Sequence, residues 1–334
     1  MENFQYVNGY KSKLNFKDNE LAIVEVRNYF ESHLAKKLHL LRVTAPLFVL
    51  SQTGINDDLN GKEVPVNFNV IDFNNRIEIV HSLAKWKRYN ISKYNLKMHH
   101  GIYTDMNAIR KDEFRDNYHS IYVDQWDYEL LIKKKDRNLN FLKKYVKKIY
   151  SVIYKTEKHI SNKYNLNRVL PKNITFITSE ELLKKYPNLS NEERVNEYIK
   201  KVKALFLIGI GHKLSNGISQ DDRAPDYDDW NLNGDIYVYN PILNNALELS
   251  SMGIRVDKNA LLEQTKLSNK EYYLNFEYQR KILNNELPLT LGGGIGQSRI
   301  CMFMLKKLHI GEVQASIWND ETRSFMQKHN VNIL

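Results

Sequence analysis

The chain has 334 residues, of which 42% are hydrophobic and 26% charged, so it has a globular composition and wholesale disorder is excluded. Lysine and arginine total 49 against 39 aspartate and glutamate, which gives a net charge of +10. No apolar run approaches the length of a membrane-spanning helix, the N-terminal segment is too polar for a secretory signal, and the single cysteine, Cys301, cannot form an intramolecular disulfide. We therefore expect a cytoplasmic protein with no membrane partner.

Residues 19–39 predict an amphipathic helix, because apolar side chains recur at three- and four-residue steps. The side chain of Asp18 or Asn19 is placed to cap this helix. Residues 40–50 then predict a strand, in which Pro46 indicates a sheet edge or a bulge.

Residues 76–81 alternate between apolar and polar side chains and predict a further strand. The segment HSLAKWKR (81–88) follows it and predicts the start of a helix. Ser82 and Lys87 at a helix N-terminus would suit an anion. The alternative is an ordinary exposed helix start.

Residues 101–110 and 119–127 predict two strands joined as a hairpin with a long, charged tip. Arg110 ends the first strand, and Gln125 and Asp127 share one face of the second because side chains alternate along a strand. A buried face with these groups is costly unless it holds a polar ligand. The alternative is a solvated face with weak ion pairs.

Residues 128–168 predict a mainly helical, lysine-rich segment. Clustered lysines permit nucleic-acid binding through phosphate contacts. A solvated amphipathic helix explains the same pattern, since lysine stems commonly cover apolar surface. We favour the second interpretation and do not expect a nucleic-acid partner.

Shorter helices are predicted after Ser179 and Ser190, and the acidic run 221–230 predicts a solvated turn. With no repeat and no low-complexity linker, we expect a single catalytic domain over residues 1–334, with residues 1–18 as an N-terminal extension. The whole pattern predicts an α+β fold, a mixed, mostly antiparallel sheet flanked by helices, with further strands at 204–210, 234–240 and 246–256.

The segment ELSSMGIRV (248–256) carries polar residues on a predicted strand. Strict alternation places Glu248 on the face opposite to Leu249 and Ser251. Glu248 and Asp235, on a nearby predicted strand, could hold Mg²⁺ through carboxylate oxygens, and Arg255 could clamp a carboxylate. The alternative is ordinary polarity at a sheet edge.

Four of the chain's 14 glycines, Gly292, Gly293, Gly294 and Gly296, fall within five residues. They predict a strand end, a glycine turn close to a ligand and a helix that begins near Arg299, whose guanidinium could bind a base or a phosphate. The alternative is a tight turn with a surface arginine. The P-loop signature is absent, so a nucleotide site needs another architecture.

Taken in order, several runs resemble the ammonia-dependent aspartate–ammonia ligase family, the AMP-forming asparagine synthetases, from about residue 20 onward. That family is similar in fold to the catalytic core of class II aminoacyl-tRNA synthetases. VTAPLF with Pro46 resembles the first, dimer-forming motif of that class, the Arg110 hairpin the second, and GGGIGQSR with Arg299 the third. The runs are HSLAKWKR, GIYTDMNAIR, HSIYVDQWDYE, RAPDYDDW, LNGDI, ELSSMGIRV and LGGGIGQSR.

The resemblance implies a homodimer that makes L-asparagine from L-aspartate, ammonia and ATP through β-aspartyl-AMP. Arg110 and Arg299 would act on the triphosphate, and Asp57 would hold ammonium and remove a proton. Mg²⁺ would be held by Asp235 and Glu248. L-Aspartate would be bound by Ser82, Lys87, Gln125, Asp127, Ser251 and Arg255, and ATP by Arg110, Asp235, Glu248, Leu249, Gly294 and Arg299.

Two other functions fit the same resemblance. A class II tRNA-charging enzyme normally carries an extra anticodon-binding domain, for which motifs that span residues 43–299 leave no room. A non-catalytic paralogue that binds RNA or regulates a partner is expected to lose the phosphate arginines or the acidic metal ligands. Here both arginines and both acidic residues are present.

Overall fold

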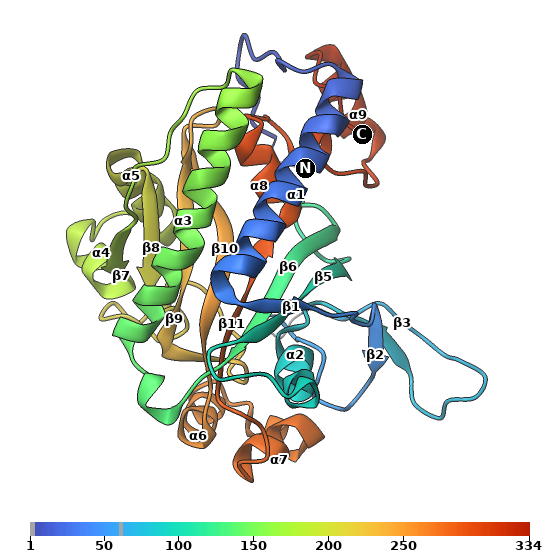
Figure 1. The fold of residues 1–334 in the computed structure, drawn as a ribbon, viewed down its shortest axis with the longest axis vertical. Coiled ribbons are helices and arrows are strands. Elements are labelled where there is room, and N and C mark those ends of the chain that lie inside the picture. Colours follow the sequence, from blue (N-terminus) through green and yellow to red (C-terminus); the bar gives the residue numbers. More distant parts are fainter. Residues whose placement is uncertain (1–3, 60–62) are drawn as a thin grey trace.

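The computed structural model describes residues 4–59 and 63–334, and within them the chain is organised around one large sheet (Figure 1). Its eight strands in the described residues are, in spatial order, β1 (Leu40–Arg42), β5 (Gly101–Ile109), β6 (Tyr122–Leu131), β11 (Thr290–Gly296), β10 (Asn245–Arg255), β9 (Asp228–Asn240), β8 (Ala204–Ile208) and β7 (Thr175–Thr178). Neighbouring strands are antiparallel, except that β1 pairs with β5 and β7 with β8 in parallel. The predicted mixed, mostly antiparallel sheet is therefore confirmed.

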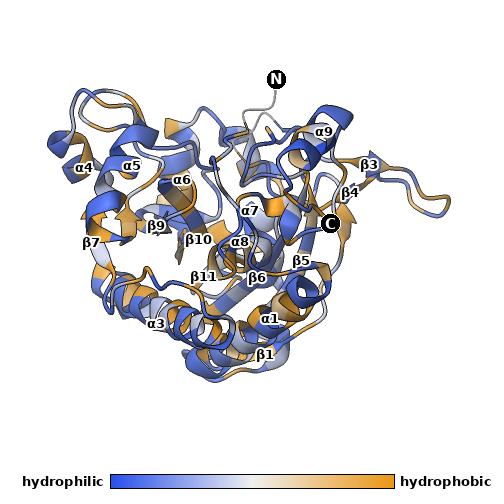
Figure 2. Cartoon of the chain, turned by 90° about the horizontal axis from the view of Figure 1, so that it is seen from above, coloured by the Kyte–Doolittle hydropathy of each residue, from blue (hydrophilic) through white to orange (hydrophobic). Residues whose placement is uncertain are grey.

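Helices α1 (Phe16–Leu38), α3 (Leu139–Tyr164) and α8 (Gln297–Met304) pack on one face of this sheet. Figure 2 shows α1 and α3 side by side along that face, with α6 (Lys258–Leu267) and α7 (Glu277–Leu283) on the other side. The three helices and the sheet bury the main hydrophobic core, to which the central strands contribute Trp126, Met252 and Ile295. Polar side chains on the opposite face of the same strands are left free for a site.

Helix α1 begins three residues before the predicted start. Asn15 caps it, because its side chain accepts a hydrogen bond from the Asp18 backbone N–H at 2.9 Å. The prediction of Asp18 or Asn19 as the cap is wrong. Asp18 lies in the first turn, where a carboxylate favours the helix dipole, and the buried Asn19 donates to the Glu312 carbonyl at 2.7 Å.

The predicted strand over residues 40–50 is two short strands in different sheets. After β1 the chain leaves the large sheet, passes Pro46 and forms β2 (Phe48–Leu50), because a proline cannot donate to a sheet ladder. In the described part of the chain, β2 joins a small sheet with β4 (Ile77–Ile79) and β3 (Asn67–Phe68), which projects from the molecule in Figure 1.

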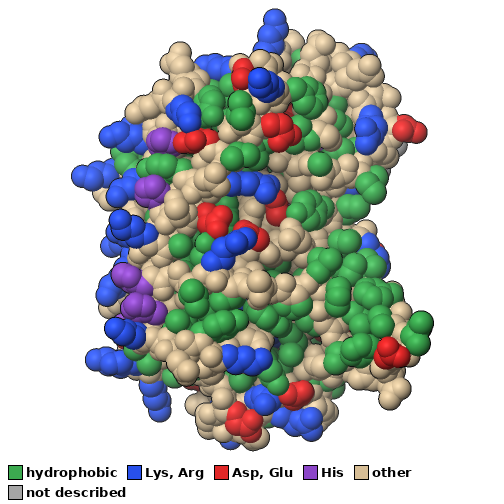
Figure 3. Space-filling view, turned by 45° about the vertical axis from the view of Figure 1, so that its right-hand side comes forward, with side chains coloured by type: hydrophobic (Ala, Val, Ile, Leu, Met, Phe, Trp, Pro, Cys, Tyr) green, Lys and Arg blue, Asp and Glu red, His purple; other side chains and the backbone are tan. Residues whose placement is uncertain are grey.

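Large hydrophobic side chains are exposed on this small sheet and on the segments that connect its strands. Phe48 is 47% exposed and Phe73 52%, and Leu50, Val64, Phe68 and Ile71 are exposed as well. Figure 3 shows hydrophobic side chains gathered on the face of the molecule that carries this sheet. Contiguous exposed apolar groups are typical of surfaces that are used for binding.

The remaining helices agree only in part with the helices predicted from the sequence. The short helix predicted after Ser190 is α5, which Ser190 caps, and the one predicted after Ser179 is α4, which begins at Ser179 and is capped by Thr178. Residues 128–131 continue β6, and α3 starts at Leu139, so the predicted helical segment begins later than expected. Elements β3, β7, α6, α7 and α9 have no counterpart among the predicted elements. The other helices are α2 (Ala84–Asn90), α4 (Ser179–Lys185), α5 (Asn191–Val202) and α9 (Asp320–Lys328), with 3₁₀ turns at Ile91–Tyr94, Lys134–Asp136, Glu271–Asn275 and Ile310–Glu312.

Residues 1–3 of the predicted N-terminal extension lie outside the described residues. The rest of the extension packs on the C-terminal part of the chain, where the hydroxyl of Tyr10 donates to Glu312 at 2.9 Å. It also contacts the connection between β5 and β6, where the Gln5 N–H donates to Asn117 at 2.8 Å. Among the described helices, none has the length and apolar character needed to cross a membrane.

Candidate active site

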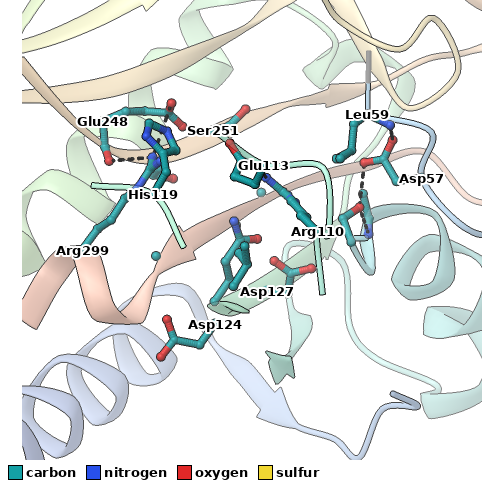
Figure 4. A pocket seen from close by; sticks show the side chains of 18 of the residues that line it. Asp57, Leu59, Arg110, Glu113, His119, Asp124, Asp127, Glu248, Ser251 and Arg299 are labelled. Atoms are coloured by element: carbon teal, nitrogen blue, oxygen red, sulfur yellow. Dashed lines mark hydrogen bonds and ion pairs between the residues drawn. The ribbon is translucent and has the colours of Figure 1, made fainter. Parts of the chain in front are cut away.

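A cavity of about 330 Å³ lies on the face of the sheet opposite α1 and α3 (Figure 4). Residues far apart in the sequence line it together. Asp235 is the exception among the predicted site residues, because it is 1% exposed and does not line the cavity. The predicted residues that do line it are Asp57, Ser82, Lys87, Arg110, Gln125, Asp127, Glu248, Leu249, Ser251, Arg255, Gly294 and Arg299.

A row of residues across four neighbouring strands runs beneath the cavity. Asp127 of β6 pairs with Gly294 of β11, Gly294 pairs with Ser251 of β10, and Ser251 pairs with Asp235 of β9. Residues directly opposite each other in a sheet lie on the same face. The register of the sheet therefore places Asp127 and Asp235 on one surface.

The glycines of β11 leave space for neighbouring side chains and do not form a turn. A Cβ atom on Gly294 would lie 2.2 Å from the Gln125 Oε1 atom, and one on Gly292 would lie 2.0 Å from Glu129 Oε2. Neither glycine has a positive φ, and both lie in a central strand. The predicted glycine turn is therefore wrong, since these glycines make room for polar groups on β6.

Lys87 and Asp127 form a buried ion pair on the floor of the cavity. The Lys87 Nζ atom lies 3.2 Å from Asp127 Oδ2 and donates to the Gly293 carbonyl at 3.2 Å, and both side chains are almost fully buried. Burial lowers the pKa of Lys87, although the Asp127 carboxylate opposes the shift. Asp127 also accepts from the Leu83 N–H at 3.3 Å, which connects the start of α2 to the sheet.

The loop that carries Asp57 is connected to the hairpin arginine through the residues just before α2. Ser82 Oγ donates to Asp57 Oδ2 at 2.8 Å, and the Leu59 N–H donates to Oδ1 at 3.0 Å. The His81 ring nitrogen Nδ1 donates to the Asp57 carbonyl at 3.0 Å, and the His81 carbonyl accepts from Arg110 Nη2 at 3.3 Å. These contacts hold the Asp57 carboxylate and the Arg110 guanidinium in one wall of the cavity.

Two arginines reach into the cavity from different sides (Figure 4). Arg110 lies 3.9 Å from Glu113 Oε2 in the hairpin tip, and Arg299 lies 3.6 Å from Glu248 Oε2. Both arginine side chains are partly exposed, at 22% each, so they are held by contacts yet open to a ligand. Facing cations of this kind suit an extended polyanion.

An extra residue in β10 changes which face Glu248 occupies. Glu248 pairs with Tyr237 and Ser250 with Ile236, so Leu249 has no counterpart on β9 and forms a bulge. Because of it, Glu248 and Ser251 share the cavity face, whereas Leu249 packs in the core. The prediction that Glu248 and Ser251 face opposite sides is wrong, since strict alternation does not survive a bulge.

Arg255 has internal partners that the sequence analysis missed. Its Nε and Nη2 atoms donate to Glu129 at 3.0 and 2.7 Å, and its Nη1 atom donates to Asp228 at 2.6 Å. Although burial favours the neutral acid, Arg255 lowers the pKa of Glu129. Glu129 lies two residues beyond Asp127, so the alternation that placed 125 and 127 on one face could have identified it.

Asp235 is covered by a third arginine, Arg223, which the sequence analysis also missed. The Arg223 Nη2 atom lies 2.6 Å from both carboxylate oxygens of Asp235. Burial raises the pKa of Asp235 to about 7, helped by Glu248 and Asp221 and opposed by Arg223. Within the described residues no three His, Cys, Asp or Glu side chains are grouped to hold a metal ion, so Asp235 and Glu248 would need oxygen ligands from elsewhere.

The acidic run 221–230 is not the solvated turn that was predicted. Asp221 and Asp222 are exposed, but Asp226, Asp228 and Asp229 are buried. Asp226 pairs with Lys85 at 2.8 Å, and the partner of Asp229 is Arg137 at 2.7 Å. The run is therefore a buried charged segment that connects the wall of the cavity to α2 and β10.

Comparison with known proteins identifies the family of this chain. The family model described as aspartate–ammonia ligase matches residues 17–330. An aspartate–ammonia ligase from Fusobacterium nucleatum is 56% identical over 97% of this chain and 99% of its own length. One from Clostridium tetani is 53% identical over 97% of this chain and 96% of its own length. The chain belongs to the aspartate–ammonia ligase family.

Solved structures similar to this member of the aspartate–ammonia ligase family are class II aminoacyl-tRNA synthetases. An asparaginyl-tRNA synthetase from Pyrococcus horikoshii, solved with asparaginyl-adenylate, has a TM-score of 0.66 at 13% identity, covering 90% of this chain and 70% of its own. The corresponding enzyme from Entamoeba histolytica, also solved with asparaginyl-adenylate, has a TM-score of 0.63 at 13% identity, covering 89% and 67%. The expected class II catalytic-core fold is thereby confirmed.

Proposed function

We propose that the cavity joins L-aspartate and ammonia to L-asparagine, with ATP converted to AMP and pyrophosphate through a β-aspartyl-AMP intermediate. The observation that carries the proposal is the placement of Arg110 and Arg299 on different sides of a cavity whose floor holds the Lys87–Asp127 pair. One space then offers cations for a triphosphate and a mixed-charge surface for an amino acid. A single catalytic domain over residues 1–334 would hold all of these groups.

The reaction needs activation because a carboxylate carbon is a poor electrophile. An oxygen of the aspartate β-carboxylate attacks the α-phosphorus of ATP, the new P–O bond forms, and pyrophosphate leaves. Ammonia then attacks the acyl carbon, and AMP leaves with the electron pair of the broken C–O bond while the nitrogen loses a proton. Arg110 would offset the charge that builds at the α-phosphate, and Arg299 would hold the triphosphate.

The polar floor of the cavity supports the binding of aspartate. The Asp127 carboxylate would hold the α-ammonium group, with Ser82, Lys87, Gln125 and Ser251 around the substrate. Arg255 uses three of its five N–H groups on Glu129 and Asp228, which leaves donors for a substrate carboxylate. This arrangement would fix the β-carboxylate toward the α-phosphate.

Asp57 would bind ammonium and accept a proton from it, because only neutral ammonia is a nucleophile. The position of Asp57 in the cavity supports this role. The buried carboxylate is fixed by Ser82 and the Leu59 N–H and lines the same cavity as Arg110.

Asp235 and Glu248 fit a Mg²⁺ ion that accompanies ATP. They are diagonal neighbours on β9 and β10, and the bulge at Leu249 places both carboxylates on one face. Carboxylate oxygens are ligands that Mg²⁺ accepts together with phosphate oxygens and water. The ion would supply charge compensation on the phosphates. The bare backbone at Gly294 and the Leu249 bulge would give ATP space to lie against the sheet.

A homodimer is part of the proposal. The segment around Pro46, which resembles the dimer-forming motif, lies beside the exposed hydrophobic side chains of β2 and β3. A second copy of the chain would cover them. Light scattering after size exclusion should give twice the chain mass, and Phe48→Asp should shift it toward the monomer.

The deciding assay follows AMP. Purified protein should form AMP from ATP when aspartate and ammonium are both present, and asparagine should appear in equal amount. Omission of either substrate should stop net AMP release. Aminoacylation of added tRNA, or salt-sensitive RNA binding without ATP turnover, would instead favour the tRNA-charging enzyme or the non-catalytic paralogue.

A further inference from the structure

Arg223 occupies an unusual place in the cavity wall. It lies in the segment between β8 and β9, lines the cavity and pairs with the buried Asp235. Its Nη2 nitrogen is equidistant, at 2.6 Å, from the two carboxylate oxygens. A single nitrogen at that apex occupies the position that a cation bound by both oxygens would take.

The surroundings make this position attractive to a cation. Glu248 and Asp221 also contribute negative charge around the Arg223 guanidinium, and both line the cavity. Arg223 offsets the charge of Asp235, while Arg299 lies beside Glu248. A divalent ion could reach the apex of Asp235 only after Arg223 had left it, because two cations cannot share that space.

Arg223 is also incompletely satisfied where it is. Its Nε atom is buried and has no hydrogen-bond partner in the described part of the chain. A buried N–H without an acceptor is costly, and a phosphate oxygen is a strong acceptor for a guanidinium. A nucleotide that enters the cavity would offer such an oxygen.

We propose that Arg223 is a placeholder cation, a positioning residue that neutralises Asp235 until a nucleotide binds and then transfers to a phosphate oxygen. Divalent metal binding at Asp235 and Glu248 thereby becomes dependent on nucleotide. The inference rests on the proposed function for the identity of the nucleotide. It rests on this structure alone for the competition between Arg223 and a metal ion.

The test measures metal binding without turnover. Free Mn²⁺, counted by its electron paramagnetic resonance signal, is titrated with wild-type protein and with Arg223→Gln in the absence of nucleotide. We expect the variant to bind Mn²⁺ about 10-fold more tightly or better, because a unit positive charge has left the carboxylate. Arg223→Met also removes the positive charge, and its Mn²⁺ affinity can be measured in place of that of Arg223→Gln if the glutamine variant is unstable.

Matched controls locate the effect. Adding Asp235→Asn to Arg223→Gln should abolish the gain, and Arg168→Gln, which removes an arginine that stacks on Tyr154 away from the cavity, should leave Mn²⁺ affinity at the wild-type level. Equal Mn²⁺ affinity of wild type and both Arg223 variants would overturn the inference. So would a gain that persists in the Asp235→Asn background.

The transfer of Arg223 to a phosphate oxygen is tested with α,β-methylene-ATP, whose α–β bridge resists cleavage. With this compound bound, the difference between wild type and Arg223→Gln should shrink or reverse, because Arg223 has moved to phosphate. An unchanged 10-fold difference would refute the transfer. None of these Mn²⁺ measurements depends on catalysis. AMP formation together with equal Mn²⁺ affinity of wild type and the Arg223 variants would overturn only the proposed role of Arg223. An inactive protein with the expected changes in Mn²⁺ affinity would overturn only the ligase proposal.

Discussion

Asp127 and Asp235 lie in one row across the sheet, separated by Gly294 and Ser251. Each carboxylate is buried against a cation, Asp127 against Lys87 and Asp235 against Arg223. The row therefore has a lysine-paired end beside Gln125, suited to an amino acid, and an arginine-paired end beside Glu248, suited to a metal–phosphate group.

Lys87→Met should destabilise the protein by about 3–5 kcal/mol, because it leaves the buried Asp127 carboxylate without its cation. Urea unfolding followed by circular dichroism measures the loss. The double variant Lys87→Met/Asp127→Asn should recover part of it, since no charge is then left unpaired. A double variant that loses the full sum of the single losses would show that the two side chains are not coupled.

Arg110→Ala and Arg299→Ala should each lower AMP formation by on the order of 10²-fold or more, since each removes a cation that would meet phosphate charge in the transition state. Steady-state assays at saturating aspartate and ammonium measure the effect. Arg168→Ala, outside the cavity, is the control and should keep wild-type turnover. Near-normal rates in either cavity variant would rule out the role given to that arginine.

Gly294→Ala and Gly293→Ala should have different consequences although they are neighbours. A Cβ on Gly294 meets Gln125 and Asp127 on the cavity face, at 2.2 and 2.7 Å, so the KM for aspartate should rise most in this variant. A Cβ on Gly293 meets Met252 and the Ser251 carbonyl at 2.6 Å each, so its cost should fall mainly on stability, by about 1–3 kcal/mol. Thermal unfolding and aspartate titrations of both variants separate the two effects, and identical profiles would contradict the assignment of faces.

His309 should make stability depend on pH. The ring is fully buried, and burial lowers its pKa from 6.5 to about 4, so the folded protein holds it neutral while the unfolded chain protonates it near pH 6.5. Stability is therefore lost as pH falls below 6.5, and the loss levels off near pH 4. Between pH 7 and 5 this group should cost about 2 kcal/mol.

His309→Gln isolates this contribution, because glutamine can still accept from the Gly311 N–H that now donates to Nδ1. Urea unfolding of both proteins at pH 7 and pH 5 gives the double difference. The variant should lose less stability on acidification than the wild type. Parallel losses in the two proteins would mean that His309 does not titrate as its burial requires.

Local sequence patterns predicted the sheet class and the hairpin. The alternation that placed Gln125 and Asp127 on one face of β6 is confirmed. In a regular strand the face of a side chain depends only on its position along the strand, which the sequence gives directly. The same rule failed at Glu248, where the bulge depends on how β10 meets β9 and not on the residues of β10 alone. Patterns that depend on a partner strand are not visible in one segment.

The sequence also did not predict the charged partners that distant segments of the chain supply to the site residues. The sequence indicated Arg255 and Asp235 as ligand-binding groups, but not that Glu129 and Asp228 engage the first and Arg223 the second. The acidic run was expected in solvent because its buried partners, Lys85 and Arg137, lie far along the chain. Burial of a charge is decided by its partner, so composition near the charge does not predict it.

The bulge at Leu249 gives β10 something like a reading frame. Because Leu249 has no counterpart on β9, deletion of this one residue would restore strict alternation, with Glu248 still opposite Tyr237 and Leu247 still opposite Val238. Deletion of a paired residue elsewhere in β10 would instead move the side chains on one side of the deletion to the other face of the sheet. A single-codon deletion should therefore be less damaging at Leu249 than at any paired position of this strand.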